Sequence, residues 1–184
     1  MRKLYAFISS TLDGYYEGPN QEFDFWVADE EFERFSVEQL DEVDMIVFGR
    51  VTYEGMAAFW PTPEAREADP RVAERMNRIA KIVVSRTLEA ADWENTTLIR
   101  DPEELRPMKE RPGADMAIFG SSKLTLGLLK LGLVDEVRVM VNPVAIGAGK
   151  SIFRGAPERI SLRLERVRQF ESGNLLLVYR PVAA

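Results

Sequence analysis

Residues 45–52 have the sequence MIVFGRVT, in which four apolar residues lead directly into a glycine, an arginine and, two positions later, a threonine. A short, continuous apolar run is typical of a strand that is buried on both faces of a sheet. The same pattern, a strand that ends in small or hydroxyl-bearing residues, recurs at 85–87 (SRT) and at 120–122 (GSS). The three strand-to-helix turns together predict a layered α/β domain.

Strands and helices alternate along the rest of the chain. We expect eight strands, over residues 3–9, 45–48, 81–85, 97–99, 116–119, 136–144, 161–169 and 174–179. We expect four helices: one capped by Asp29 with Phe32, Phe35, Leu40 and Val43 on its apolar face, one beginning at Pro70 after Asp69, a short one with a capping box from Asp101, and one over residues 121–131. Gly and Asn in residues 171–174 predict a tight antiparallel hairpin at the C-terminal end. Residues 11–25 show neither the apolar period of a helix nor that of a strand, so we expect a mobile loop there.

The composition excludes several classes of protein. The chain has 184 residues and neither cysteine nor histidine, which excludes thiol nucleophiles, Ser-His-Asp triads and zinc bound by nitrogen or sulfur. We expect no metal site. A net charge of -6 repels a polyanion, so nucleic acid is not an expected partner. No apolar run reaches the roughly 18 residues that cross a bilayer, and no signal peptide opens the chain. We therefore expect one soluble domain over residues 1–184, in the cytoplasm and without membrane contact.

The three turns also indicate a ligand. The carboxyl edge of an open α/β sheet is where ligands bind, and a turn that opens a helix directs backbone N–H groups toward anions. Arg50 and Arg86 add two permanent cations with a geometry suited to phosphate. Each turn alone is more typical of an ordinary strand end, but the three together favour an extended phosphorylated ligand such as a dinucleotide. Since no acidic residue at the second turn could bind a free ribose 2′-hydroxyl, the residues favour NADPH over NADH.

A second glycine-rich segment, GAGKS at residues 147–151, is similar to the end of a nucleotide-binding P-loop. The first glycine of that motif would fall at Val144, so we reject phosphoryl transfer at this segment. A turn after the preceding strand is the simpler interpretation.

With these motifs in order, the sequence resembles the dihydrofolate reductase superfamily, in particular the branch that contains the C-terminal reductase domain of riboflavin biosynthesis proteins. The resemblance rests on segments spread over nearly the whole chain: STLDG at 10–14, FGRVTYE at 48–54, VSRTL at 84–88, FGSS at 119–122, GLVDE at 132–136 and NPV at 142–144, followed by Gly147, Gly149, Lys150 and Phe153. It implies a three-layer fold, with flanking helices on a mixed, mostly parallel eight-stranded sheet that ends in an antiparallel hairpin.

The resemblance also implies how NADPH would bind. Arg50 and Thr52 would lie near the adenosine phosphate, beside Ser85, Arg86 and Thr87. The backbone of Gly49 and Gly120 would approach the cofactor closely, and Gly120, Ser121 and Ser122 would lie under the pyrophosphate. Ser9 and the loop from Asp13 to Tyr16 would lie near the nicotinamide. Relatives of this kind are often dimers, so we expect a homodimer.

The substrate side is less specific. Aromatic side chains that could stack on a flat heterocycle gather near the expected nicotinamide position: Tyr15, Tyr16, Phe23, Phe25, Trp26, Tyr53 and Trp60. Folate reductases carry a carboxylate early in the first helix, and Asp24, Asp29, Glu30 and Glu31 lie near that position. We select Tyr16, Trp26, Glu31 and Tyr53 as substrate contacts and Asp13 as a catalytic proton relay. The aromatic residues could instead cover the core, and an Asp before Gly also shapes turns.

Two functions are therefore open. The first is an NADPH-dependent reductase that transfers a hydride to a C=N or C=O bond of a small pterin-like or aminopyrimidine-like substrate. The second is a sensor or accessory protein that binds a dinucleotide or a pterin without turnover.

Overall fold

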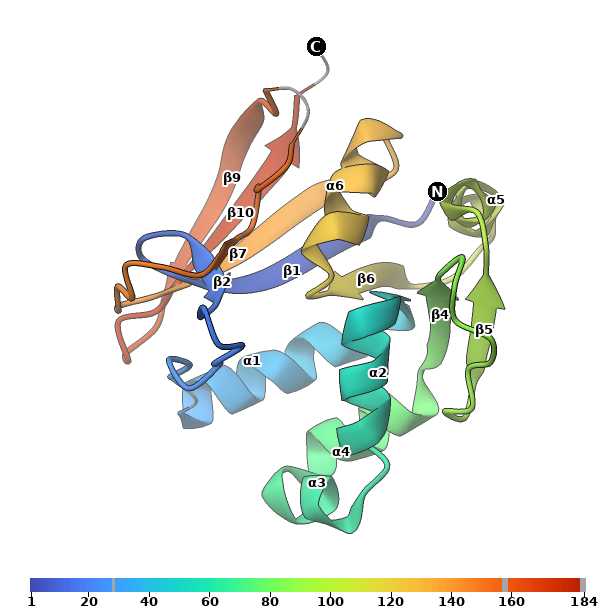
Figure 1. Cartoon of the computed structure of the whole chain (residues 1–184), viewed down its shortest axis with the longest axis horizontal. Helices are drawn as coiled ribbons and strands as arrows, with labels where there is room; N and C mark the ends of the chain where they lie inside the picture. Colours follow the sequence, from blue (N-terminus) through green and yellow to red (C-terminus); the bar gives the residue numbers. More distant parts are fainter. Residues whose placement is uncertain (28, 157–158, 183–184) are drawn as a thin grey trace.

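The computed structural model describes residues 1–27, 29–156 and 159–182, and its centre is one eight-stranded sheet (Figure 1). Across the sheet the strands are β5 (Thr96–Ile99), β4 (Ala80–Val84), β3 (Val43–Gly49), β6 (Asp115–Phe119), β1 (Leu4–Thr11), β7 (Glu136–Asn142), β10 (Leu175–Pro181) and β9 (Leu162–Gln169). Neighbours from β5 to β7 are parallel, whereas β10 is antiparallel to both β7 and β9. The expected mostly parallel sheet with an antiparallel C-terminal hairpin is confirmed.

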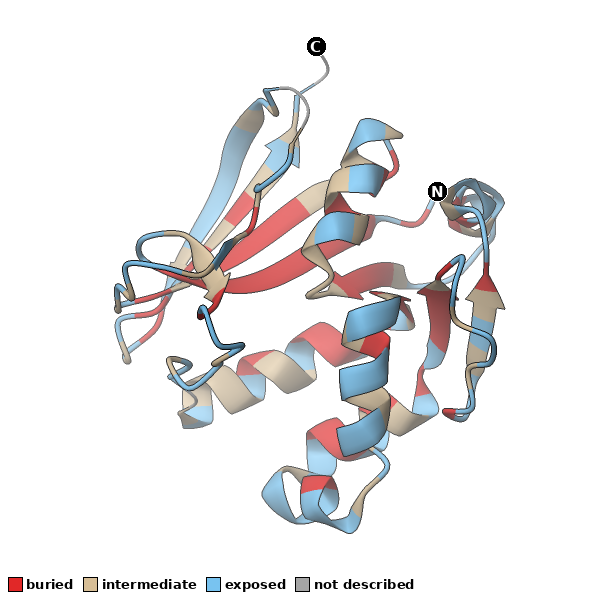
Figure 2. Cartoon of the chain, in the orientation of Figure 1, coloured by how far each residue is buried: buried red, intermediate tan, exposed pale blue. Residues whose placement is uncertain are grey.

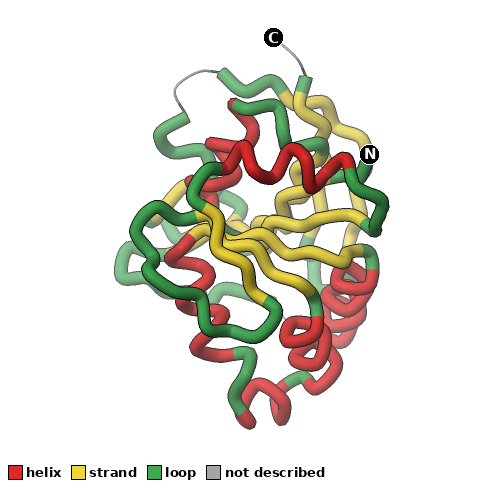
Figure 3. Tube along the Cα trace, turned by 90° about the vertical axis from the view of Figure 1, so that its right-hand side faces the viewer, coloured by secondary structure: helices red, strands yellow, loops and turns green. Residues whose placement is uncertain are grey.

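Helices cover both faces of the sheet, giving three layers (Figure 1), and Figure 3 shows them above and below the twisted strands. One side holds α1 (Glu30–Asp41), α2 (Arg50–Phe59), α3 (Pro63–Ala68) and α4 (Pro70–Arg78), and the other holds the 3₁₀ helix η1 (Pro102–Glu104), α5 (Leu105–Glu110) and α6 (Ser122–Lys130). The central strand β1 is buried throughout. Its Tyr5 and Phe7 pack toward α1, while Ala6 and Ile8 pack toward α6. Burial on both faces explains why the parallel strands are continuously apolar.

The helix starts follow the capping residues. The Asp29 carboxylate accepts the N–H of Phe32, and Asp69 caps α4 with two such bonds. Asp101 and Glu104 form the expected capping box. The assignment of Val43 to the first helix is wrong: α1 ends at Asp41, and Val43 begins β3, where it pairs with Asp115.

The interpretation of residues 11–25 as one irregular loop is also wrong in part. Tyr15–Glu17 forms the short strand β2, which pairs with β8 (Lys150–Ser151) in a separate two-stranded sheet. An ion pair joins Glu17 to Lys150 across these strands. The glycine-rich segment 147–151 therefore ends in a strand, and no helix follows it in residues 152–156. This geometry agrees with the rejection of a P-loop.

The outer strand β9 is the most exposed strand of the sheet (Figure 2). Among the described residues it pairs only with β10, and its other edge has no strand partner there. Leu164 and Val167 are about half exposed, and three arginines, Arg163, Arg166 and Arg168, lie among them.

Candidate functional site

The sheet brings the three small-residue turns together. Because β4, β3 and β6 are adjacent and parallel, their carboxyl ends lie at one edge of the sheet. Gly49 there precedes α2, Ser85 follows β4, and Gly120 follows β6. The predicted common edge is confirmed by the strand order.

Ser121 connects the first turn to the third. Its hydroxyl accepts the backbone N–H of Gly49 at 2.9 Å and donates to the hydroxyl of Thr52 at 2.8 Å. Ser121 has a left-handed backbone, with φ 52° and ψ 54°, which is uncommon for a residue other than glycine. The two hydrogen bonds hold the strained residue between the starts of α2 and α6.

Gly120 is fixed by two separate constraints. Its φ of 65° lies in the left-handed region, and a Cβ at this position would lie 3.3 Å from the Thr52 methyl group. The next residue but one, Ser122, opens α6 and is half-buried. The third turn therefore presents bare backbone at the start of a nine-residue helix, an arrangement that suits an anion.

The second turn is organised by Ser85. The side chain is buried, and its oxygen accepts the N–H groups of Thr87 at 3.2 Å and Leu88 at 3.0 Å. The carbonyl of Ser85 accepts from the Arg100 guanidinium at 2.8 Å. Ser85 thus shapes the turn from within, while Arg86 and Thr87 remain exposed.

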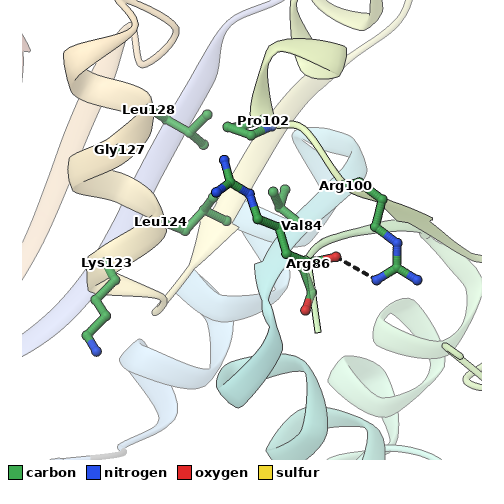
Figure 4. A pocket seen from close by; sticks show the side chains of 9 residues that line it. Val84, Arg86, Arg100, Pro102, Lys123, Leu124, Gly127 and Leu128 are labelled. Carbon is green, nitrogen blue, oxygen red and sulfur yellow. Dashed lines mark hydrogen bonds between the residues drawn. The ribbon is translucent and has the colours of Figure 1, made fainter. Parts of the chain in front are cut away.

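A pocket of about 250 Å³ opens between the second turn and α6 (Figure 4). Its lining consists of Val84, Ser85, Arg86, Arg100, Pro102, Lys123, Leu124, Gly127 and Leu128. Figure 4 shows the Arg86 guanidinium extending between Leu124 and Pro102, with Lys123 at one rim. The pocket combines apolar walls with positive charge, which suits a flat ring that carries a phosphate.

Arg50 and Arg86 differ in their surroundings. Both oxygens of Glu54 accept from one nitrogen of Arg50 at 3.0 Å, one helical turn away. Arg50 is not part of the pocket lining, whereas Arg86 is, and within the described residues Arg86 makes no salt bridge. The structure therefore brings one of the two predicted arginines to the pocket.

Ser9 lies in β1 and is buried. Its hydroxyl accepts from the side-chain amide of Asn142, at the end of the neighbouring strand β7, at 2.9 Å. Ser9 is two strands away from β3 in the sheet order, so it lies further along the same edge than the first turn.

Asp13 joins two loops. Its carboxylate accepts the Thr11 hydroxyl at 2.6 Å, and the N–H groups of Ile146 and Gly147 at 3.2 and 2.8 Å. These bonds, that of Thr11 first, lower the pKa of Asp13. An exposed carboxylate with a lowered pKa is ionised at neutral pH and has no proton to donate. Its contacts are those of a residue that shapes a turn.

The four residues predicted to contact the substrate have different surroundings in the structure. Tyr16 is half-buried in β2, and Trp26 is 41% exposed, with its ring edge-on to Phe32 at 6.1 Å. Glu31 accepts from Arg168 and from the backbone of Glu171, which connects α1 to the C-terminal hairpin. Tyr53 is 4% exposed and accepts the N–H of Trp93, so it belongs to the core. Trp26 and Tyr16 alone keep exposed ring surface for a ligand.

Sequence reasoning predicted only Ser85 and Arg86 of the nine residues that line the pocket. Lys123 and Leu124 follow the third turn, and their helical spacing relative to Gly127 and Leu128 could have placed them on one face. Arg100 follows the expected strand 97–99 and Pro102 follows the capping residue Asp101, but neither belongs to a small-residue turn that would have marked it as part of a site.

Within residues 1–27, 29–156 and 159–182, no helix is long and apolar enough to cross a membrane. No group of three or more acidic residues among them is arranged to hold a metal ion.

Comparisons with known proteins give a consistent result. The model of the RibD C-terminal domain family matches residues 2–176. The uncharacterised protein YyaP of Bacillus subtilis (strain 168) is 32% identical over an alignment of 182 residues, and the match covers 97% of this chain and 94% of YyaP.

Two solved structures share the fold. One, from Shewanella sp. PV-4 and assigned provisionally to riboflavin biosynthesis, has a TM-score of 0.74 at 18% identity, with 98% of this chain and 99% of that chain covered. The other is a diaminohydroxyphosphoribosylaminopyrimidine deaminase/5-amino-6-(5-phosphoribosylamino)uracil reductase from Thermotoga maritima, with a TM-score of 0.67 at 18% identity. The match covers 98% of this chain but 57% of the Thermotoga chain.

Proposed function

Because the chain belongs to the RibD C-terminal domain family, we propose that it is a reductase that uses NADPH to transfer a hydride to a C=N or C=O bond of a small heterocycle. The name of the Thermotoga neighbour describes reduction of an aminopyrimidine, and the proposed substrate is of that class or pterin-like. The observation that carries the proposal is the pocket beside three neighbouring turns at the carboxyl edge of the sheet, of which Ser121 connects the first and the third.

The residues of the edge fit the cofactor. Arg86 and Lys123 would hold the ribose 2′-phosphate, with the apolar walls of Leu124 and Pro102 for the adenine. Gly120 leaves open backbone where a Cβ would press on Thr52, and with Gly49, Ser121 and Ser122 it would hold the pyrophosphate. Ser85 and Thr87 would keep the second turn in shape, and Arg50 would need to leave Glu54 to reach a phosphate.

The substrate would lie beyond Ser9, near Tyr16 and Trp26. When bound, NADPH supplies the hydride, and a proton must reach the other atom of the reduced bond. Since Asp13 is ionised, the chain would take that proton from water, and Asp13 would hold the two loops in place. The chain's contribution is then mostly to orient the two reactants.

A titration tests this proposal. Purified protein is titrated with NADPH and with NADH, and binding is followed by cofactor fluorescence and by thermal shift. Selective binding of NADPH supports the cofactor half, and oxidation of NADPH with any member of a panel of dihydropterins and diaminopyrimidinones supports the reaction. Failure to bind either cofactor would overturn the proposal.

One observation favours the second function, a binding protein without turnover. The carboxylate chosen as a proton relay already accepts hydrogen bonds from Thr11, Ile146 and Gly147. Stoichiometric NADPH binding without oxidation across the whole panel would select this alternative.

We also propose a homodimer, which rests on the resemblance to dimeric relatives. The half-exposed Leu164 and Val167 of the C-terminal hairpin offer apolar surface to a second copy. Light scattering that finds only the 20.9 kDa chain would refute this.

A further inference from the structure

The peptide segment around Val27 is held by two buried asparagines. The N–H of Val27 donates to the side-chain oxygen of Asn142 at 3.4 Å, and its carbonyl accepts from the side-chain nitrogen of Asn174 at 3.1 Å. Asn142 is 1% exposed and Asn174 is fully buried. They come from different parts of the sheet, the end of β7 and the turn between β9 and β10. Burial of an amide is unfavourable unless its hydrogen bonds are made, which favours these contacts. Among the described residues the side-chain oxygen of Asn174 has no hydrogen-bond partner, so its bond to Val27 is made through the nitrogen alone.

Asn142 has a second set of contacts that Asn174 lacks. Its side-chain nitrogen donates to the Ser9 hydroxyl and to the Ser10 carbonyl, each at 2.9 Å. The Asn142 side chain therefore bonds β1 through its nitrogen, and it bonds Val27, which follows Trp26, through its oxygen. The two bonds have fixed relative directions because the amide is planar.

We propose that Asn142 is a positioning residue that couples Ser9, on the cofactor side of the site, to the segment that carries Trp26, on the substrate side. The inference rests on the proposed function, since that function assigns Ser9 and Trp26 to the two sides. A displacement of Ser9 when cofactor binds turns the amide, and the amide moves Val27 and the adjoining Trp26. Asn174 holds the same peptide but does not contact Ser9, so it anchors the segment without coupling it.

Three variants separate these roles. Asn142→Ala removes both sets of contacts, Ser9→Ala removes only the cofactor-side hydroxyl, and Asn174→Ala removes only the second anchor of Val27. The readout is acrylamide quenching of Trp26, obtained as the difference from Trp26→Phe in each background. NADP⁺ is the ligand, because it does not absorb Trp emission, and calorimetry gives its affinity.

We expect NADP⁺ to reduce the quenching of Trp26 in the wild type. Asn174→Ala should raise quenching without ligand and keep the response to NADP⁺. Ser9→Ala should leave quenching without ligand unchanged but lose the response, and Asn142→Ala should show both defects. Each loss of a hydrogen bond near the cofactor should raise the NADP⁺ dissociation constant by about 2- to 10-fold.

A response that survives in both Asn142→Ala and Ser9→Ala would overturn the inference, as would a wild type that binds NADP⁺ without any change at Trp26. If Asn142→Ala does not fold, Ser9→Ala and Asn174→Ala still decide between coupling and anchoring. If the wild type does not bind NADP⁺, the proposed function and the cofactor side of the coupling fail together. Quenching of unliganded Asn142→Ala then tests the Val27 contact separately, and an unchanged value would refute that contact as well.

Discussion

Ser121 holds the proposed site together at the level of single residues. A left-handed backbone at a residue other than glycine is unfavourable by about 1 kcal/mol, and here it points the hydroxyl at both Gly49 and Thr52. The left-handed backbone conformation is strained, but it positions the hydroxyl for both hydrogen bonds. A glycine would adopt this conformation without strain but has no hydroxyl to make either bond.

This balance predicts the effect of two substitutions. Ser121→Ala keeps the strain and loses both hydrogen bonds, so it should lower the free energy of unfolding by about 1–3 kcal/mol. Ser121→Gly loses the same bonds but relieves the strain, so it should be less destabilising by about 1 kcal/mol. Urea unfolding measures both. Equal losses in the two variants would show that the left-handed conformation carries no strain.

The arginines give a second prediction at this scale. Arg86→Ala should weaken the binding of NADPH by about 1.5–3 kcal/mol, the range for a hydrogen bond to a charged group. The same substitution should leave the binding of NADH almost unchanged. Arg50→Ala should act in the same direction but less strongly, because Arg50 must first leave Glu54. Fluorescence titration measures both affinities, with Arg34→Ala, a salt-bridged arginine of α1, as the control. If Arg86→Ala weakens the binding of NADPH and NADH equally, Arg86 does not contact the 2′-phosphate.

Among the elements, α4 depends on a lysine from the strand that follows it. The side-chain nitrogen of Lys81 donates to the carbonyls of Met76, Asn77 and Ile79 at 2.9, 3.1 and 2.7 Å. It also lies 4.4 Å from the centre of the Trp93 ring. A cation at a helix C-terminus is favourable, but burial works against the charge and lowers the pKa of Lys81 to about 8.

A pH dependence follows. Between pH 8 and 10.5 the unfolded chain keeps a proton on Lys81 that the folded chain has lost, so stability rises with pH over this window. The wild type should therefore gain up to about 3 kcal/mol relative to Lys81→Met as pH rises through it. Urea unfolding at several pH values measures the difference, and Lys3→Met, an exposed lysine, serves as the control. A difference that does not change with pH would contradict the lowered pKa.

Elements with a clear period or cap could be predicted from the sequence. The apolar runs identified the sheet strands, and Asp29, Asp69 and Asp101 identified helix starts because capping is a local interaction. The pair of β2 and β8 could not be found this way. Those strands have three and two residues, too few for a period, and they pair across more than 130 positions of sequence.

At the scale of the whole molecule, the sheet order decides which motifs meet. Three turns could be assigned to one edge from sequence, since parallel strands share a direction. Other features of the site depend on side-chain packing between distant segments and could not be predicted. They are the position of Arg86 rather than Arg50 at the pocket, the burial of Tyr53, and the hydrogen bond between Asn142 and Val27. The assignment of residues 1–184 to one domain stays a prediction.

The open edge of β9 leads to a prediction about association. An exposed edge strand can pair with another chain, and charged side chains on the strand oppose this. The double variant Arg163→Val, Arg166→Val should therefore aggregate at a lower protein concentration than the wild type. Light scattering during incubation measures this, with Arg34→Val on α1 as the control for lost charge. Equal solubility of the variant and the wild type would show that the arginines do not protect the edge.

The same strand makes solubility depend on ionic strength. β9 carries three arginines and one glutamate. Arg163 pairs with Glu165, and Arg168 pairs with Glu31 and Glu38, so among the described residues Arg166 is the arginine of β9 whose charge chiefly opposes a second copy aligned edge to edge. The Debye length falls from about 10 Å at 0.1 M salt to about 3 Å at 1 M, which is shorter than the spacing of adjacent strands. Concentrated salt thus weakens this repulsion, while the half-exposed Leu164 and Val167 continue to favour contact. At moderate salt the repulsion between these edges persists.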